Sequence, residues 1–284
     1  MANNIELAQK FIPVLDAAYK KSALSSILDA PTQVSFDGTN TVKVMKVTTT
    51  GLGDYSRANG YAKGNVTVEW EPFTLTEDRS AELEVDRMDD EETLGQAFGM
   101  AIGEFNRLNV GPELDAYRFA KYASMTGIGS KAGALADGAA VIAALREGAT
   151  AMDEGEVPAE DRVLFITPTL KGIVDDLDTT KSKEVLKRFS AVVEVPQSRF
   201  YTAITMNSGA SEWGYTKGDG AANINFLIVA KTAIIQAQKM ALPKLFSPDE
   251  NQSKDAWKFQ YRLYHDAFVY EKKASGIYVH KATA

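Results

Sequence analysis

The chain of 284 residues contains no cysteine and only two histidines, His265 and His280. The absence of cysteine excludes disulfide bonds, thiolate nucleophiles, iron–sulfur clusters and zinc sites with cysteine ligands. With so few histidines, a metal site or a base that works at neutral pH would have to be built mostly from Asp, Glu, Lys or Tyr. Enzymatic chemistry is therefore disfavoured from the start.

Long apolar runs and an excess of basic side chains are also missing. No segment approaches the roughly 20 apolar residues that cross a bilayer, and the start MANNIELAQKF lacks the basic-then-apolar order of a secretory signal. The 31 basic and 38 acidic side chains give a formal charge of −7. This balance argues against a broad nucleic-acid-binding surface, because such affinity comes mainly from neutralised phosphates. We expect a soluble protein, made in a cytoplasm, with no membrane partner.

The motifs of common catalytic and nucleotide-binding sites are absent. There is no GxxxxGK[ST] phosphate loop, no GxSxG nucleophile elbow and no HExxH zinc site. His265 and Asp266 are adjacent, but neighbouring residues of a strand point to opposite faces, so they cannot pair as a base and its orienting carboxylate. We therefore expect no catalytic, cofactor-binding or metal-binding residues, and no enzyme.

Alternating apolar residues predict a long hairpin in the first third of the chain. The segment TVKVMKVTT and the run of Val66, Val68 and Trp70 have the pattern of strands. The glycines of GLGDYSRANGYAKGN between them suit a loop, and a third strand follows around Leu83 and Val85. A two-stranded ribbon is only marginally stable alone, so we expect a neighbouring subunit to cover it.

A long helix is predicted over residues 89–125, with a bend at Gly111-Pro112. Asp89 and Glu92 have the spacing of a capping box at its start. Three glycines, Gly95, Gly99 and Gly103, recur on one stripe, although each costs about 0.8–1.0 kcal/mol relative to alanine in a helix. We expect another backbone to pack closely against this stripe.

The second half of the chain predicts strands grouped around helices, without regular alternation of the two. A helix capped by Asp137 covers 137–152, and proline after Thr167 opens another. Strands are expected at 163–167, 191–195, 200–206, 224–239 and 256–270, and IYVH should close a terminal hairpin with the last of them. The fold class predicted from this order is α+β.

Several phrases of the sequence resemble one family. They are MANNIELAQKFIPVLDAAYKKSALSS, GLGDYSRANGYAKGNVT, AELEVDRMDDEETLGQAFGMAIGEF and VGPELDAYRFAKYA. With the order of the elements, they resemble the major capsid proteins of tailed bacteriophages, in particular of siphophages that infect Gram-positive bacteria. The resemblance spans essentially the whole chain and implies the Hong Kong 97-type capsid fold.

The resemblance also implies a division of the chain. It gives an N-terminal arm at 1–38, an extended E-loop with its adjoining strand at 39–87, a P-domain with the spine helix at 88–130, an A-domain at 131–249, and return strands of the P-domain at 250–284.

The implied function is structural. Copies of the chain would form pentamers and hexamers of an icosahedral head shell, a virion capsid assembled in the host bacterial cytoplasm around double-stranded DNA, without sequence-specific contact to that DNA. A portal protein is an expected partner. Residues 1–38 are too few for a fused scaffolding domain, so a separate scaffolding protein is expected, while a decoration protein and a maturation protease are left open. The alternative is an encapsulin-type nanocompartment, which shares the fold and encloses cargo proteins.

Contacts between subunits are expected at five residues, Tyr55, Arg57, Tyr61, Lys63 and Gly99. Some members of the family join an E-loop lysine to an asparagine of a neighbouring subunit, and Lys63 is the donor that position would suggest. Only Tyr61 is near in sequence to exclude water from Lys63, and no asparagine is marked as acceptor. We therefore expect no covalent crosslink, and an ordinary polar contact at Lys63.

Overall fold

The computed structural model describes residues 23–29, 35–37, 41–57, 60–92, 97–177 and 180–283. Most of the expected N-terminal arm lies outside these residues. The strands are β1 (Ser35–Asp37), β2 (Thr41–Thr49), β3 (Val66–Thr74), β4 (Glu77–Asp86), β5 (Gly129–Ala132), β6 (Arg162–Ile166), β7 (Ala191–Glu194), β8 (Ile204–Met206), β9 (Tyr215–Lys217), β10 (Ile224–Ala230), β11 (Ile234–Phe246), β12 (Ala256–Val269) and β13 (Ile277–Lys281). The α-helices are α2 (Arg87–Glu92), α3 (Ala97–Phe105), α4 (Gly111–Ser124), α5 (Gly138–Glu154), α6 (Pro168–Asp176) and α7 (Thr180–Leu186). Shorter helical segments are η1 (Leu24–Leu28), η2 (Asn106–Val110), η3 (Gln197–Arg199), η4 (Lys231–Ala233) and η5 (Glu271–Gly276).

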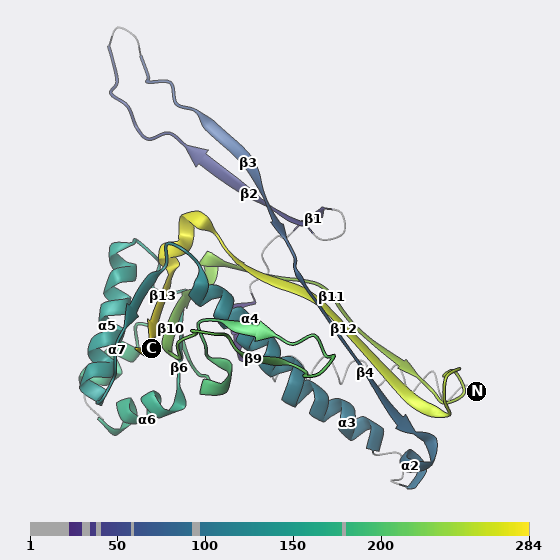
Figure 1. The fold of residues 1–284 in the computed structure, drawn as a ribbon. Helices are drawn as coiled ribbons and strands as arrows, with labels where there is room; N and C mark the ends of the chain where they lie inside the picture. Colours follow the sequence, from purple (N-terminus) through teal and green to yellow (C-terminus); the bar gives the residue numbers. More distant parts are fainter. Residues whose placement is uncertain are drawn as a thin grey trace.

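A five-stranded mixed sheet, in the order β5-β13-β10-β6-β7, forms the centre of the compact part of the molecule (Figure 1). Successive residues of a strand point to opposite faces. On β6, Leu164 and Ile166 belong to the hydrophobic cluster with α5, α6 and α7, whereas Val163 and Phe165 belong to the cluster with Phe119 of α4. The sheet therefore lies between two helical layers, which explains why every residue of β6 is buried.

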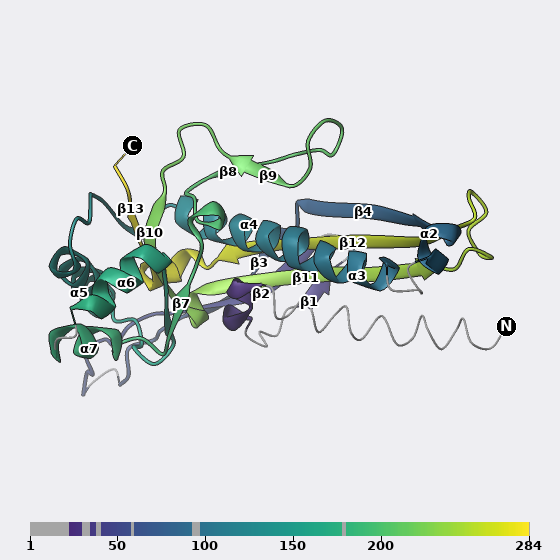
Figure 2. The same ribbon diagram turned by 90° about the horizontal axis from the view of Figure 1, so that it is seen from below.

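A long antiparallel sheet, in the order β11-β12-β4, extends from the compact part. Helices α3 and α4 run along this sheet (Figure 2). Their contact forms a separate hydrophobic cluster whose buried members include Ile102, Val110, Leu114, Phe259, Tyr261 and Leu263. Helix α4 thus contributes to both cores and joins the two sheets.

The expected C-terminal hairpin is wrong. Strand β12 pairs with β11 and β4, whereas β13 pairs with β10 and β5 in the other sheet. Four successive residues of β13, Ile277 to His280, are buried, and a strand buried on both faces suits the interior of a covered sheet. The strand expected at 224–239 is also divided, because η4 separates β10 from β11 and takes the chain from one sheet to the other.

The predicted long helix is present with an irregularity earlier than expected. Residues 93–96 lie outside the described part of the chain, and η2 (Asn106–Val110) is a π-helix that leads into α4. Pro112 lies in the first turn of α4. Proline has no N–H and its ring clashes with the carbonyl group four residues earlier, so the preceding turn widens. The irregularity therefore lies one turn before the expected bend at Gly111-Pro112.

The two capping predictions have different outcomes. The expectation for Asp89 is wrong, because α2 begins at Arg87 and it is the backbone N–H of Met88 that receives a cap, donating to Oδ1 of Asp86 at 2.9 Å. The expectation for Asp137 is confirmed, since its Oδ1 accepts from the N–H of Ala140 at 2.7 Å. A carboxylate in the first turn of a helix and a carboxylate at its N-cap both interact favourably with the positive end of the helix dipole. The positions of acidic residues alone therefore do not locate the N-cap.

Gly148 of α5 approaches the sheet so closely that a methyl group has no room. A Cβ atom there would lie 2.8 Å from Cδ1 of Tyr278 and 2.9 Å from Cδ1 of Ile228. We predict that Gly148→Ala lowers the free energy of unfolding by about 1–3 kcal/mol, because overpacking outweighs the gain in helix propensity. A Cβ at Gly172 of α6 meets nothing within 4 Å, so the control Gly172→Ala should stabilise by up to about 1 kcal/mol. Urea unfolding measures both, and stabilisation by Gly148→Ala would contradict the prediction.

Candidate assembly interface

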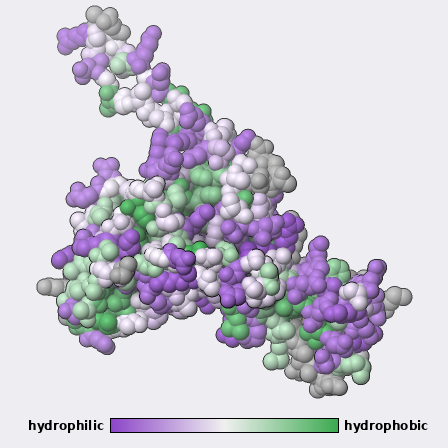
Figure 3. All heavy atoms as spheres, in the orientation of Figure 1, coloured by the Kyte–Doolittle hydropathy of each residue, from purple (hydrophilic) through white to green (hydrophobic). Residues whose placement is uncertain are grey.

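The ribbon, defined as β2, β3 and residues 50–65 between them, projects from the body of the molecule (Figures 1 and 3). Its strands pair antiparallel from Thr41↔Thr74 to Thr49↔Val66. Strand β1 adds three paired residues at the end near the body. From Met45 to the tip, the described residues of β2 are exposed or half-buried. The outer part of the ribbon is therefore largely open to solvent, apart from the contacts of Lys46 with Glu271 and of Thr48 with Lys272 on one side.

One face of the ribbon is apolar. Directly paired residues of antiparallel strands share a face, and every second pair returns to it. Met45 pairs with Trp70, and Val47 pairs with Val68, on the same face. This apolar ribbon face consists of Met45, Val47, Val66, Val68 and Trp70, whose exposed fractions run from 50% to 69%. The opposite face is polar, with the pairs Lys46↔Glu69 and Thr48↔Thr67.

The tip of the ribbon is closed by its own hydrogen bonds. The N–H of Thr50 donates to the carbonyl oxygen of Asn65 at 3.1 Å, and the N–H of Asn65 donates to Oγ1 of Thr50 at 3.0 Å. Further out, Ser56 and Gly60 exchange backbone hydrogen bonds of 3.0 and 2.7 Å. Gly60 has φ of 78°, in the left-handed region that glycine adopts without strain. Hydrogen bonds within the loop therefore hold its described residues, 50–57 and 60–65, together at both of these points.

Four of the five expected contact residues come together at this tip. The rings of Tyr55 and Tyr61 meet edge to face with centroids 5.2 Å apart, and Tyr61 is 88% exposed. Arg57 and Lys63 are exposed residues of the same loop. The fifth residue, Gly99, is half-buried on α3, in the body of the molecule. Contact of these residues with neighbouring subunits stays a prediction.

The glycine stripe of the long helix has a partly open side. Gly103 is exposed, and a Cβ atom there would meet nothing within 4 Å. Gly95 lies outside the described residues. Within the described part of the subunit no atom comes within 4 Å of a Cβ at Gly103, so the close approach of another backbone stays a prediction there.

The base of the ribbon is held by residues that the sequence analysis did not single out for this role. Leu75, between β3 and β4, is 3% exposed and packs with Val42 and Ile235. Oη of Tyr264 donates to the carbonyl oxygen of Leu75 at 3.1 Å. Thr76, the residue that follows Leu75, donates hydrogen bonds to the fully buried carboxylate of Asp266. The sequence around Asp266 gives no signal of this role, because Thr76, to which the carboxylate is hydrogen-bonded, lies 190 residues away in the chain.

Burial determines the protonation states of the ionisable side chains around the base of the ribbon. Desolvation, with smaller contributions from Arg118 and Arg79, lowers the pKa of His265 to about 3. The imidazole is therefore neutral near pH 7, and its ring meets the ring of Tyr117 edge to face at 5.2 Å. Burial, followed by the hydrogen bond to Asp266, raises the pKa of Tyr117 above its usual range. Both side chains act as neutral packing groups.

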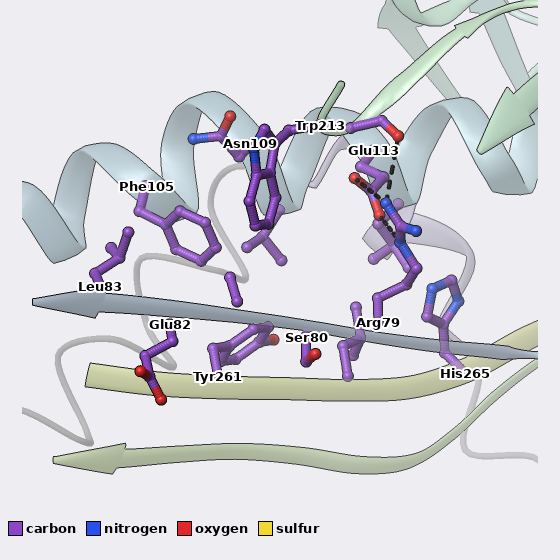
Figure 4. Close-up of a pocket in the computed structure, with 15 residues that line it drawn as sticks. Arg79, Ser80, Glu82, Leu83, Phe105, Asn109, Glu113, Trp213, Tyr261 and His265 are labelled. Atoms are coloured by element: carbon purple, nitrogen blue, oxygen red, sulfur yellow. Dashed lines mark hydrogen bonds and ion pairs between the residues drawn. The ribbon is translucent and has the colours of Figure 1, made fainter. Parts of the chain in front are cut away.

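A groove of about 290 Å³ lies between α4 and β4 (Figure 4). Its apolar lining includes Leu83, Phe105, Tyr261 and the 72% exposed Trp213. At one end Nε of Arg79 donates to Oε1 of Glu113 at 2.7 Å, and Nη1 donates to the carbonyl oxygen of Asn207 at 2.7 Å. Arg79 thereby fastens β4, α4 and the loop between β8 and β9 to one another.

No helix in the part of the chain that the structure describes is long and apolar enough to cross a membrane. Among the same residues, no group of three or more His, Asp or Glu side chains could hold a metal ion.

Comparisons with known proteins identify the fold. No protein-family model and no curated protein matches the sequence. Among solved structures, the capsid of cyanophage P-SCSP1u is 13% identical, with a TM-score of 0.58, over 88% of this chain and 85% of that one. The mature capsid of bacteriophage PhiM1 is 13% identical, with a TM-score of 0.57, over 87% and 83%. A virus-like particle from Pyrococcus furiosus is 13% identical, with a TM-score of 0.63, over 97% and 99%.

At these identities the similarity concerns the fold alone. The chain has the Hong Kong 97-type fold found in phage capsids, and the expected α+β class is confirmed.

The ionised carboxylate of Glu77, at the start of β4, destabilises the folded state at neutral pH. Burial first and Asp266 second raise the pKa of its carboxyl group, and Glu113 adds to this, although Arg79 and Lys121 lower it in part. A carboxyl group whose pKa is raised in the folded state loses stability as the pH rises through that pKa. We predict that Glu77→Gln raises the free energy of unfolding at pH 7 by less than about 1 kcal/mol, because solvent screens the partly exposed group. The gain should vanish below about pH 4, where Glu77 is protonated in both states.

Glu84 on the same strand is the matched control. Hydrogen bonds from Lys258 and Lys254 lower the pKa of its carboxyl group, so its charge favours the folded state above the unfolded pKa. Glu84→Gln should therefore have the opposite sign at pH 7 and no effect in acid. Thermal unfolding at the two pH values distinguishes the variants. An equal gain from Glu77→Gln at both pH values would contradict the electrostatic explanation.

Proposed function

We propose that this chain is the major capsid protein of a tailed bacteriophage, and that its copies assemble into the icosahedral head shell enclosing double-stranded DNA. The observation that carries the proposal is the apolar ribbon face, where five side chains are exposed by half or more in a segment that leaves the body. Exposed apolar patches mark interaction surfaces, and symmetric assembly covers the same patch on every copy. The Hong Kong 97-type fold supports the same function, although fold by itself does not determine function.

The proposal assigns a role to each part of the described structure. The ribbon is the E-loop, the long sheet with α3 and α4 is the P-domain, and the five-stranded sheet with α5, α6 and α7 is the A-domain. This assignment amends the expected residue limits, because β11 joins the P-domain sheet and β13 joins the A-domain sheet. Lys63 would make a polar contact with a neighbouring subunit, without a covalent crosslink.

The proposed partners follow from this role. Copies of the chain form pentamers and hexamers, with a portal protein at one vertex and a separate scaffolding protein during assembly in the host cytoplasm, while a decoration protein is left open. Packaged DNA is enclosed without sequence-specific contact, which is compatible with the net charge of −7. The role needs no enzymatic activity, and a siphophage of Gram-positive bacteria stays the predicted source.

An encapsulin-type nanocompartment is the second candidate. The observation in its favour is the match to the Pyrococcus furiosus virus-like particle, which covers 97% of this chain and 99% of that one. A compartment of this type encloses proteins, whereas a phage head encloses DNA. The contents of the particle therefore separate the two candidates.

Electron microscopy of the full-length chain after size-exclusion chromatography tests the shared part of both proposals. Closed shells of megadalton mass are expected, or pentamers and hexamers where the proposed scaffolding protein is missing, and a chain that stays monomeric at all concentrations would contradict both. Particles isolated from a phage lysate test the difference. The chain should be the most abundant protein of tailed, DNA-containing particles. Its presence only in tailless, protein-filled particles would favour the nanocompartment.

The apolar ribbon face can be tested with a matched pair of lysine substitutions. Val68→Lys places a charge at the centre of this face, and Thr67→Lys places the same charge on the polar face one residue earlier. Both positions are exposed, so neither change should lower subunit stability by more than about 0.5 kcal/mol. Val68→Lys should reduce the particle yield at least about tenfold, because burying an unpaired ammonium group is costly, whereas Thr67→Lys should assemble normally. Analytical ultracentrifugation measures the yield, and equal yields would show that the apolar ribbon face stays in water.

A further inference from the structure

The ribbon is joined to the body on the β3 side through only two residues, Leu75 and Thr76. On one side of this link, β3 pairs with β2. On the other side, β4 pairs with β12, and the pair nearest to the link is His265↔Glu77. A link of two residues between separate sheets leaves the direction of the ribbon to the groups that hold those residues and to a few contacts of the ribbon with the body, which are Phe73 with Phe268, Lys46 with Glu271 and Thr48 with Lys272.

Asp266 of β12 lies beside the link and is completely buried. Its Oδ2 accepts hydrogen bonds from N and Oγ1 of Thr76, at 3.0 and 2.9 Å. Its Oδ1 accepts from Oη of Tyr117 and from the N–H of Ala267, each at 2.7 Å. Four donors match the acceptor sites of an ionised carboxylate, which has no proton to donate. An asparagine side chain would turn an NH₂ group towards donors, so this position requires a carboxylate.

The same carboxylate contacts the helix that joins the two sheets. Tyr117 and Lys121 both belong to α4, and Nζ of Lys121 lies 3.7 Å from Oδ1 of Asp266. Phe119 and Tyr122 of this helix are buried in the core of the compact part. Polar contacts therefore connect helix α4, through Asp266, to Thr76 in the link to the ribbon.

We propose that Asp266 is a positioning residue for assembly, which sets the direction of the ribbon by holding Thr76 to α4. The inference rests on the proposed function, because the direction of the ribbon matters only if the ribbon contacts a second copy. The apolar ribbon face is covered only when the ribbon reaches its neighbour at one angle. A ribbon released at its base samples many angles, and each subunit then presents this face in the wrong place for most of the time.

Packing at Leu75 is the competing explanation. This side chain is 3% exposed among Val42, Val44, Ile235 and Ala237, and such a cluster could fix the direction without Asp266. Single-atom changes distinguish the two. Thr76→Val removes the hydroxyl hydrogen bond and keeps the branched shape, Thr76→Ser retains the hydroxyl group, and Tyr117→Phe removes the donor on α4. Leu75→Ala weakens the packing alone.

The absence of cysteine makes a direct measurement of direction straightforward. Spin labels at Leu52→Cys, at the exposed tip, and Ala139→Cys, on the exposed side of α5, report the distance between ribbon and body by pulsed electron resonance. The full-length labelled chain is diluted into a large excess of unlabelled chains, so that only distances within one subunit are read. Circular dichroism confirms that each variant is folded. Thr76 is exposed on its outer side, so Thr76→Val remains informative if Tyr117→Phe fails to fold.

We expect the width of the distance distribution to increase about twofold in Thr76→Val and in Tyr117→Phe, since each loses a hydrogen bond to a charged acceptor. Thr76→Ser should keep the wild-type width. Wild-type widths in Thr76→Val and Tyr117→Phe, with broadening in Leu75→Ala alone, would overturn the proposal in favour of packing. Electron microscopy of the unmutated chain tests the proposed function separately. Assembly of the unmutated chain together with a wild-type distribution width in Thr76→Val refutes only the role of Asp266, whereas broadening in a chain that stays monomeric at all concentrations refutes only the proposed function.

Discussion

A two-stranded ribbon cannot bury an apolar face within itself. Pairing satisfies the backbone groups between the strands, but both faces stay open unless a third layer covers them. Here β2 and β3 gather five apolar side chains on one face and polar pairs on the other, and the helices α3 to α7 in the described part of the chain pack against the two other sheets. The rest of the structure serves to hold this unsatisfied face away from the body in a defined direction.

Helix α4 is the element from which that direction is controlled. Besides its contact with Asp266, it carries Asp115, a completely buried carboxylate that accepts hydrogen bonds from the N–H groups of Leu24 and Ser25, each at 2.9 Å, and from Arg199 at 3.2 Å. Burial raises the pKa of Asp115, and these donors oppose the shift. Removing one partner of such a buried charge is strongly destabilising. The start of the described chain, η3 and the ribbon base are therefore fixed relative to a single helix.

The sequence predicted the features that depend on local periodicity and missed those that depend on which distant segments meet. Alternation predicted the hairpin, a continuous apolar run predicted the strand β6, and helical spacing predicted the long helix. The segment IYVH fits either sheet equally well as a pattern, so its position beside β10 became visible only in three dimensions. Val66, Val68 and Trp70 were recognised as one face of a strand in a ribbon that needs a neighbouring subunit to cover it, and this face is exposed in the single subunit. Asp266 gave no local signal, because its four donors come from other segments or from its own backbone.

The apolar ribbon face is too weak to hold two subunits together by itself, and this weakness suits a shell. Fully burying a large apolar side chain contributes about 1.5–3 kcal/mol, so covering five that are 50% to 69% exposed contributes about 4–9 kcal/mol. Association of two subunits costs about 4–15 kcal/mol in lost translational and rotational freedom. The net free energy of a single contact is therefore close to zero. In the proposed shell each subunit gives one ribbon and receives another, while the freedom of each subunit is lost only once. Contacts of this size stabilise a closed shell and let isolated or misplaced pairs dissociate, which allows errors to be corrected before the shell closes.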